Sequence, residues 1–76
     1  MASQRFDGHL LRRFRVRLGY SRANVAIAAR RSEQTIVLYE LGKVVPPVKV
    51  VEDLAVCLEV DPGDLFTAEP DHDPGA

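Results

Sequence analysis

The chain contains 76 residues, 46% of them apolar and 28% charged, which suits one globular domain with a small core. No apolar run approaches the roughly 20 residues of a membrane-spanning helix, and no apolar stretch follows the N-terminal arginines as it would in a signal peptide. The single cysteine, Cys57, leaves no intrachain disulfide and no cysteine-based zinc cluster to expect. A cytoplasmic protein is therefore expected.

The net charge of −1 hides a strong asymmetry along the chain. Residues 1–31 carry eight arginines and one acidic residue, whereas residues 32–76 carry two lysines and ten acidic residues. The first segment thus has a net charge of +7 and the second −8. This division favours a basic surface for a polyanion, although two solvated faces of opposite sign would give the same count.

A flexible arm over residues 1–6 is expected to precede the first helix, at residues 7–18. The helix is predicted by an apolar stripe at spacings of three and four residues, formed by Leu10, Leu11, Phe14 and Leu18. Arg15 lies at the border of this stripe. Gly19 suits the left-handed residue that often follows a helix.

Two serine-capped helices come next. Ser21 is the expected N-cap of a helix over residues 22–28, and Ser32 is that of a helix over residues 33–41. Asn24 stands where a capping box normally has Glu or Gln, which predicts an incomplete box.

The second half of the chain begins where Gly42 ends the third helix. Pro47 suits the first position of a helix over residues 47–58. Asp61 is the expected N-cap of a short fifth helix. Residues 67–76 are acidic, contain prolines and lack an apolar pattern, so they predict a disordered tail.

Catalytic and metal-binding chemistry is not expected. The sequence offers no paired carboxylates, no nucleophile with a base and no phosphate-binding glycine loop. His9 and His72 lack companion ligands at metal spacing, and Cys57 suits a small packing residue. We therefore expect neither an enzyme nor a bound cofactor or metal.

The order of these elements resembles the helix-turn-helix of the phage repressor and Cro superfamily, also called the xenobiotic-response-element type. The resemblance covers residues 10–66, and its diagnostic stretch is residues 18–46, LGYSRANVAIAARRSEQTIVLYELGKVVP. The residues that match in register are Leu11, Phe14, Arg15, Ser21, Val25, Ala26, Ser32, Thr35, Ile36, Tyr39, Glu40, Gly42, Lys43, Pro47, Leu54, Ala55, Leu58, Val60, Asp61, Leu65 and Phe66.

The resemblance implies an all-α, five-helix, lambda-repressor-like DNA-binding domain over residues 7–66. The predicted core consists of Leu11, Phe14, Leu18, Val25, Ala29, Ile36, Tyr39, Val50, Leu54, Leu58 and Leu65. Any sheet, or an Ile36 that faces solvent, would rule out the superfamily fold. Arg15 and Glu40 are expected to form an ion pair, because a partly buried charge without an opposite charge beside it is costly. The resemblance implies the same pair.

In this superfamily the second helix of the motif lies in the major groove and its first residues face the base edges. The resemblance assigns backbone contacts to Ser21, Arg22 and Lys43, and Arg31, which departs from the superfamily pattern, is a further expected phosphate contact. It assigns base-facing positions to Glu33, Gln34 and Leu38, with Ser32 and Thr35 at the rim. Gln34 can pair bidentately with adenine, and Glu33 can accept a hydrogen bond from cytosine. A solvated surface amide is the alternative for Gln34.

Two features depart from the superfamily pattern. Arg30 and Arg31 occupy the turn that commonly has glycine and a small apolar residue. Because a left-handed non-glycine residue costs on the order of 1 kcal/mol, either the turn differs in shape or these arginines contact phosphates. Aliphatic residues also replace common polar ones, at Ile27, Val37, Leu38, Val44 and Val45, and Leu41 replaces an asparagine.

Two functions remain open. The first is a sequence-specific DNA-binding transcriptional regulator, acting as a homodimer on a near-palindromic site, in which Val37 and Leu38 touch thymine methyl groups. Candidates for its dimer interface are Val56, Val60 and the fifth helix. The second is a helix-turn-helix used as a protein-docking module, such as an antitoxin, an antirepressor or a regulatory subunit. Its surface would comprise Ile27, Val37, Leu38, Leu41, Val44 and Val45.

Overall fold

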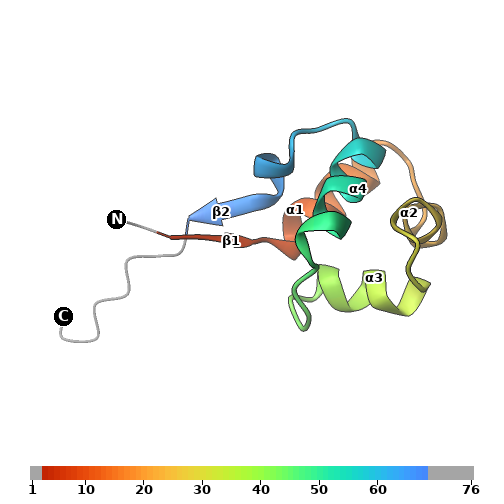
Figure 1. Cartoon of the computed structure of the whole chain (residues 1–76). Coiled ribbons are helices and arrows are strands. Elements are labelled where there is room, and N and C mark those ends of the chain that lie inside the picture. Colours follow the sequence, from red (N-terminus) through yellow and green to blue (C-terminus); the bar gives the residue numbers. More distant parts are fainter. Residues whose placement is uncertain (1–2, 69–76) are drawn as a thin grey trace.

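A computed structural model describes residues 3–68 of the chain, and it is mostly helical (Figure 1). The elements in chain order are β1 (Gln4–Phe6), α1 (Gly8–Arg17), α2 (Arg22–Ala29), α3 (Glu33–Glu40), α4 (Val48–Leu58), η1 (Pro62–Leu65) and β2 (Phe66–Ala68). The four α-helices lie within one residue of their predicted bounds at each end. None of the helices over residues 3–68 is long and apolar enough to cross a membrane.

The count of five helices needs correction, because η1 is a single turn of 3₁₀-helix. Pro47 is also the N-cap of α4 and not its first helical residue. An extended conformation at Pro47, with φ −62° and ψ 160°, explains this shift. The predicted start signal at Asp61 is confirmed, since Asp61 caps η1 and its backbone N–H donates to the Asp64 carboxylate at 3.0 Å.

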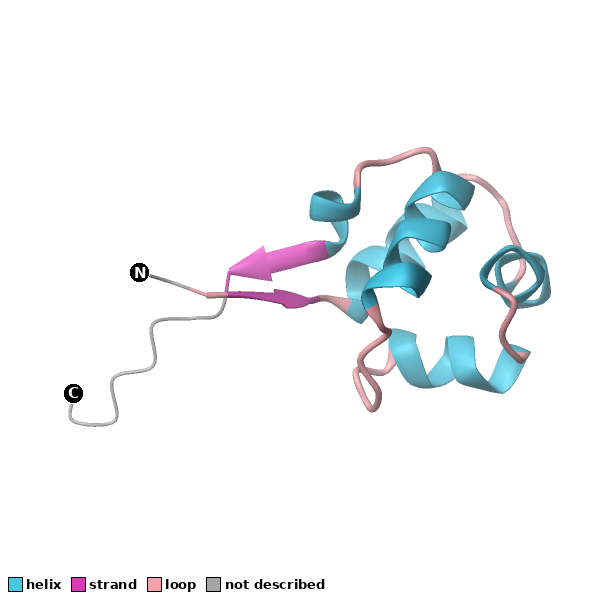
Figure 2. Cartoon of the chain, viewed as in Figure 1, coloured by secondary structure: helices cyan, strands magenta, loops and turns pink. Residues whose placement is uncertain are grey.

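The expectation that the described residues form no sheet was wrong. Strands β1 and β2 pair in antiparallel register, with Phe6 opposite Phe66, and extend away from the helices (Figure 2). The Phe6 ring meets the rings of Phe66 and Tyr39 edge to face, at centroid distances of 6.1 Å and 6.5 Å. This aromatic cluster anchors to the core the segment that was expected to be a flexible arm.

The sheet overlaps both segments expected to flank the domain. Residues 4–6 belong to β1, and the acidic tail expected from residue 67 begins inside β2, which ends at Ala68. Residues 1–2 and 69–76, which include His72, lie outside the described residues. The sheet joins the two ends of the helical unit and leaves Ile36 fully buried, so it does not disturb the packing of α1 to α4. The expectation that any sheet would rule out this fold was therefore wrong.

The core lies between the four α-helices and η1. Nine of the eleven predicted core residues are buried, among them Leu11, Val25, Ile36, Leu54 and Leu65 with no exposed surface. Phe14 is half-buried. Leu18 was a wrong prediction: it is 36% exposed, because α1 ends at Arg17 and the chain turns away from the core at Gly19. The hydrophobic core residues missing from the predicted list are Ala26, Val51 and Ala55.

One close approach positions α3 against α1. A Cβ atom on Gly8 would lie 2.1 Å from the backbone oxygen of Tyr39 and 2.6 Å from that of Glu40. Only a residue without a side chain lets the first turn of α1 meet the last turn of α3 at this distance. The contact fixes the end of α3 that carries Glu40.

Candidate nucleic-acid interface

Helices α2 and α3 form a compact helix-turn-helix. Only three residues separate them, and α2 is seen almost along its axis in Figure 1 while α3 lies across the view. Arg30 adopts the left-handed conformation with φ 55°, and the N–H of Arg31 donates to the Ala26 carbonyl at 3.0 Å. The turn therefore keeps the left-handed shape typical of a glycine, even though an arginine occupies it.

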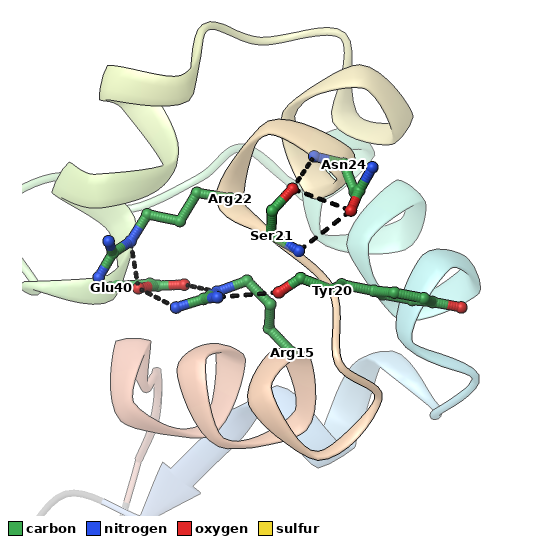
Figure 3. Close-up of polar contacts among 6 residues, drawn as sticks. All are labelled: Arg15, Tyr20, Ser21, Arg22, Asn24 and Glu40. Atoms are coloured by element: carbon green, nitrogen blue, oxygen red, sulfur yellow. Dashed lines mark hydrogen bonds and ion pairs between the residues drawn. The ribbon is translucent and has the colours of Figure 1, made fainter.

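Serine side chains cap both helices of the motif. The Ser21 hydroxyl accepts the Asn24 backbone N–H at 3.0 Å, and the Asn24 side chain accepts the Ser21 backbone N–H at 3.1 Å (Figure 3). The capping box is complete, so the expectation of an incomplete one was wrong. Asparagine is shorter than glutamate, yet its amide oxygen reaches the same N–H. At α3, the Ser32 hydroxyl accepts the Thr35 backbone N–H at 3.1 Å.

These caps engage the hydroxyls of three predicted DNA contacts, Ser21, Ser32 and Thr35. The Ser32 and Thr35 hydroxyl oxygens lie 2.8 Å apart, and the Ser21 hydroxyl donates to the Asn24 amide oxygen. The hydroxyls of Ser21, Ser32 and Thr35, together with the side-chain amide of Asn24, stabilise the first turns of α2 and α3. The other N–H groups in the first turn of each helix have no carbonyl partner within the helix, and such groups suit an anion.

Glu40 joins three elements through one buried carboxylate. Its side chain is 3% exposed and accepts hydrogen bonds from the Arg15 Nε atom at 2.6 Å and from the Arg22 Nε atom at 3.0 Å (Figure 3). Arg15 also donates from Nη1 to the Tyr20 carbonyl at 2.9 Å. The predicted pair of Arg15 with Glu40 is confirmed. The network connects α1, the loop before α2, the start of α2 and the end of α3.

The bond from Arg22 to Glu40 was not predicted. Arg22 was expected to face DNA phosphate, but its Nε atom points inward to Glu40 while 40% of its side chain stays exposed. One carboxylate facing two guanidinium groups leaves a net charge of +1 in this cluster. The sequence signal for this bond was slight: once Arg15 and Glu40 pair, a basic residue at the start of α2 lies close to the same carboxylate.

The outward face of α3 carries both polar and aliphatic residues. Glu33 and Gln34 are exposed, Val37 and Leu38 are half-buried, and Leu41 is 64% exposed. The apolar character expected for this face is therefore concentrated at its C-terminal end. It continues into the connection to α4, where Val44 and Val45 are exposed, and to Val48, the exposed first residue of α4.

Three cations flank α3 without a carboxylate partner. Among residues 3–68 the ion pairs join Glu40 to Arg15 and Arg22, and Lys49 to Asp53. Arg30, Arg31 and Lys43 are exposed and belong to none of them. Arg30 and Arg31 precede α3 and Lys43 follows it. Both ends of the helix therefore carry uncompensated positive charge, whereas Glu33 supplies a single negative charge at its start.

Other chemistry is sparse in the described part of the chain. No group of three His, Cys, Asp or Glu residues between positions 3 and 68 is arranged to hold a metal ion. Cys57 is half-buried on α4, and burial raises the pKa of its thiol. The thiol is therefore protonated at neutral pH and suits the packing role predicted for it.

Comparison with known proteins gives one family and several related folds. The chain matches the family model described as a helix-turn-helix domain over residues 8–67. No curated protein sequence matches it. Among solved structures, the restriction-modification controller protein C.AhdI from Aeromonas hydrophila is 24% identical, with a TM-score of 0.72 over 76% of this chain and 88% of that one.

Two further structures share the fold. The clp gene regulator ClgR from Corynebacterium glutamicum is 24% identical, with a TM-score of 0.73 over 76% of this chain and 62% of that one. The hypothetical transcription factor NHTF from Neisseria is 21% identical, with a TM-score of 0.73 over 80% of this chain and 70% of that one. These likenesses agree with the helical arrangement expected from the sequence.

Proposed function

Since the chain belongs to the helix-turn-helix domain family, we propose that it is a sequence-specific DNA-binding transcriptional regulator with α3 in the major groove. The observation that carries the proposal is the exposed outward face of α3, bounded at both ends by unpaired cations. A polyanion satisfies those cations, and a helix of this size fits the major groove. Two of the three similar structures are named as a controller protein and a gene regulator, which supports the same function.

The residues of the site divide by what they contact. Backbone contacts come from Ser21, Arg22, Arg31 and Lys43. Base-facing residues are Glu33, Gln34 and Leu38, with Ser32 and Thr35 at the rim. The proposed active form is a homodimer, whose two-fold symmetry matches the two half-sites of a near-palindromic DNA site. Val56 on α4 is exposed and Val60 is half-buried, so both remain candidates for the dimer interface.

Selection of bound sequences from a pool of random DNA duplexes tests this function. We expect one enriched sequence with two-fold symmetry. Gln34→Ala then relaxes discrimination at one base pair of each half-site by about 1–3 kcal/mol. Arg31→Ala weakens binding to all sequences alike and is a better backbone variant than Arg22→Ala, because Arg22 also holds Glu40. A pool that emerges without enrichment contradicts the proposal.

A protein-docking module is the second candidate, and the aliphatic surface after α3 favours it. Leu41, Val44, Val45 and Val48 are exposed aliphatic residues close together in the sequence of a small chain, and apolar patches often mark interaction sites. Ile27 is exposed on α2, and the half-buried Val37 and Leu38 adjoin the patch on α3. Leu38→Asn separates the two candidates. Retained DNA binding with loss of a co-purifying protein would favour docking and contradict the DNA-reading role of α3.

A further inference from the structure

The face of α3 that points away from the core carries one amide and two leucines. Gln34, Leu38 and Leu41 follow one another at spacings of four and three residues, so they form one stripe along the helix. Ile36 and Tyr39, on the opposite side, are buried. Gln34 is exposed, Leu38 is half-buried and Leu41 is 64% exposed. We call these three residues the outward stripe.

Each member of the outward stripe has a defined partner in a major groove. A glutamine amide pairs bidentately with the N6 and N7 atoms of adenine. A leucine side chain has no polar atoms, and the C5-methyl group of thymine is the only apolar group that the major groove presents. Against a G·C pair, the same leucine would cover hydrogen-bonding atoms without satisfying them, which costs free energy.

From this stripe, and resting on the proposed function, we propose that α3 reads thymine methyl groups next to an adenine. Gln34 specifies the adenine, and Leu38 and Leu41 specify the thymines. Leu41 takes the place expected for Val37, because Val37 is half-buried and lies about 100° around the helix from Leu38. The target class is therefore a half-site whose centre is made of A·T pairs.

Charge around the stripe favours DNA over an apolar protein as its occupant. Arg30 and Arg31 lie before α3 and Lys43 lies after it, all exposed and without carboxylate partners in residues 3–68. An apolar protein surface covering the stripe would approach all three cations without neutralising them. Phosphate groups on both sides of a major groove neutralise cations at both ends of the helix.

Replacement of thymine by uracil tests the inference, because it removes the methyl group and leaves the hydrogen-bonding pattern unchanged. The probe is the duplex recovered from the random pool, synthesised with deoxyuridine at one thymine position at a time. For the wild-type protein we expect one or two positions per half-site at which uracil weakens binding about fourfold. That factor corresponds to about 0.8 kcal/mol for one buried methyl group. At all other thymines the affinity stays unchanged.

Two variants identify the residues that read the methyl groups. In Leu38→Ala and Leu41→Ala, the thymine and uracil duplexes should bind equally at the position that each leucine contacts. Leu41→Ala removes an exposed side chain, so its fold is preserved if Leu38→Ala proves unstable. Val16→Ala is the matched control, since Val16 is an exposed aliphatic residue of α1 outside the stripe, and it should keep the full uracil effect.

The outcomes separate this inference from the proposed function. Sequence-specific binding that is indifferent to uracil at every position overturns the inference and leaves the proposed function intact. A uracil effect that persists in both leucine variants also overturns it, because another residue then reads the methyl groups. The absence of enrichment from the random pool overturns both. A protein partner that needs Leu41 while DNA binding does not would assign the stripe to docking.

Discussion

Glu40 shows how a single buried residue determines the geometry of the motif. Its carboxylate has two arginine partners and almost no exposed surface. A buried charge that loses its partner is costly, since desolvation is then uncompensated. Because Arg15 comes from α1, Arg22 from α2 and Glu40 from α3, the network fixes both helices of the motif to the first helix.

Neutralising Glu40 should therefore destabilise the fold strongly. Glu40→Gln keeps the shape of the side chain and leaves the Arg15 guanidinium buried without a counter-charge. We expect the free energy of unfolding in urea to fall by about 3–5 kcal/mol. Asp53→Asn is the matched control, because it removes the exposed pair with Lys49 and should cost about 0.5 kcal/mol or less. Equal small losses in both variants would contradict the role given to Glu40.

Gly8 sets the distance between α1 and α3. A methyl group at Gly8 would overlap the backbone oxygens of Tyr39 and Glu40, which cannot move unless the end of α3 shifts. We expect Gly8→Ala to lower the free energy of unfolding by about 1–3 kcal/mol. Gly63→Ala is the control, since no atom lies within 4 Å of its added Cβ, and it should be neutral or slightly stabilising. A stable Gly8→Ala variant would show that α3 can shift freely.

The sequence predicted some of the contacts made by these residues and missed others. The pair of Arg15 and Glu40 was predictable, because both flank apolar stripes and the superfamily resemblance implies the same pair. The importance of Gly8 was not, since it depends on an approach between backbones that no local pattern reveals. The bond from Arg22 to Glu40 was missed because Glu40 already had Arg15 as its predicted partner and Arg22 was assigned to a DNA phosphate.

All four α-helices end in the same closing geometry. After each helix a left-handed residue is followed by an N–H that donates to the carbonyl five residues earlier, as from Tyr20 to Arg15 and from Val60 to Ala55. The left-handed residue is Gly19 after α1 and Gly42 after α3, but it is Arg30 after α2 and Glu59 after α4. Two of the four helix ends thus carry backbone strain that glycine would relieve.

Relieving that strain should stabilise the protein. Glu59→Gly removes the left-handed penalty at an exposed position, and we expect the free energy of unfolding to rise by about 0.5–1 kcal/mol. Gly19→Ala makes the reverse change where no neighbouring atom interferes, and it should lower the free energy by a similar amount. Thermal unfolding measures both. An unchanged or lower stability of Glu59→Gly would mean that its carboxylate stabilises the helix end by other contacts.

At the element scale, the helices could be predicted and the strands could not. Apolar periodicity, serine caps and glycine ends placed each α-helix within one residue at either end. Strands of three residues are too short to show an alternating pattern. Their pairing also joins opposite ends of the described chain, Gln4 with Ala68, so no local signal points to it. The rotation of 100° per residue in an α-helix predicted which aliphatic residues of α3 point outward. It did not predict that two of them, Val37 and Leu38, are half-buried.

At the scale of the whole molecule, the division of charge along the sequence corresponds to different elements of the fold. Seven of the eight arginines of the basic half lie in α1, α2 and the turn before α3, whereas the acidic residues of the second half begin at Glu33. Glu40 neutralises one of its two arginine partners, and Arg22 is the more exposed of the pair. The cations predicted to contact phosphate are Arg22, Arg31 and Lys43, and Arg30 is a further exposed cation beside α3.

The salt dependence of DNA binding should report how many of these cations act together. Three phosphate contacts per protomer make six in a homodimer, which gives a slope near −5 for log affinity against log salt concentration, against about −3 for a monomer. Arg31→Ala removes one contact per protomer, so the slope should become shallower by about 2 in a dimer and by about 1 in a monomer. Arg13→Ala, on the exposed face of α1, should leave it unchanged. The change in slope caused by Arg31→Ala is proportional to the number of protomers bound to the DNA. The wild-type slope and this change together therefore give both the number of phosphate contacts and the number of protomers. A wild-type slope near zero would contradict binding through the phosphate backbone.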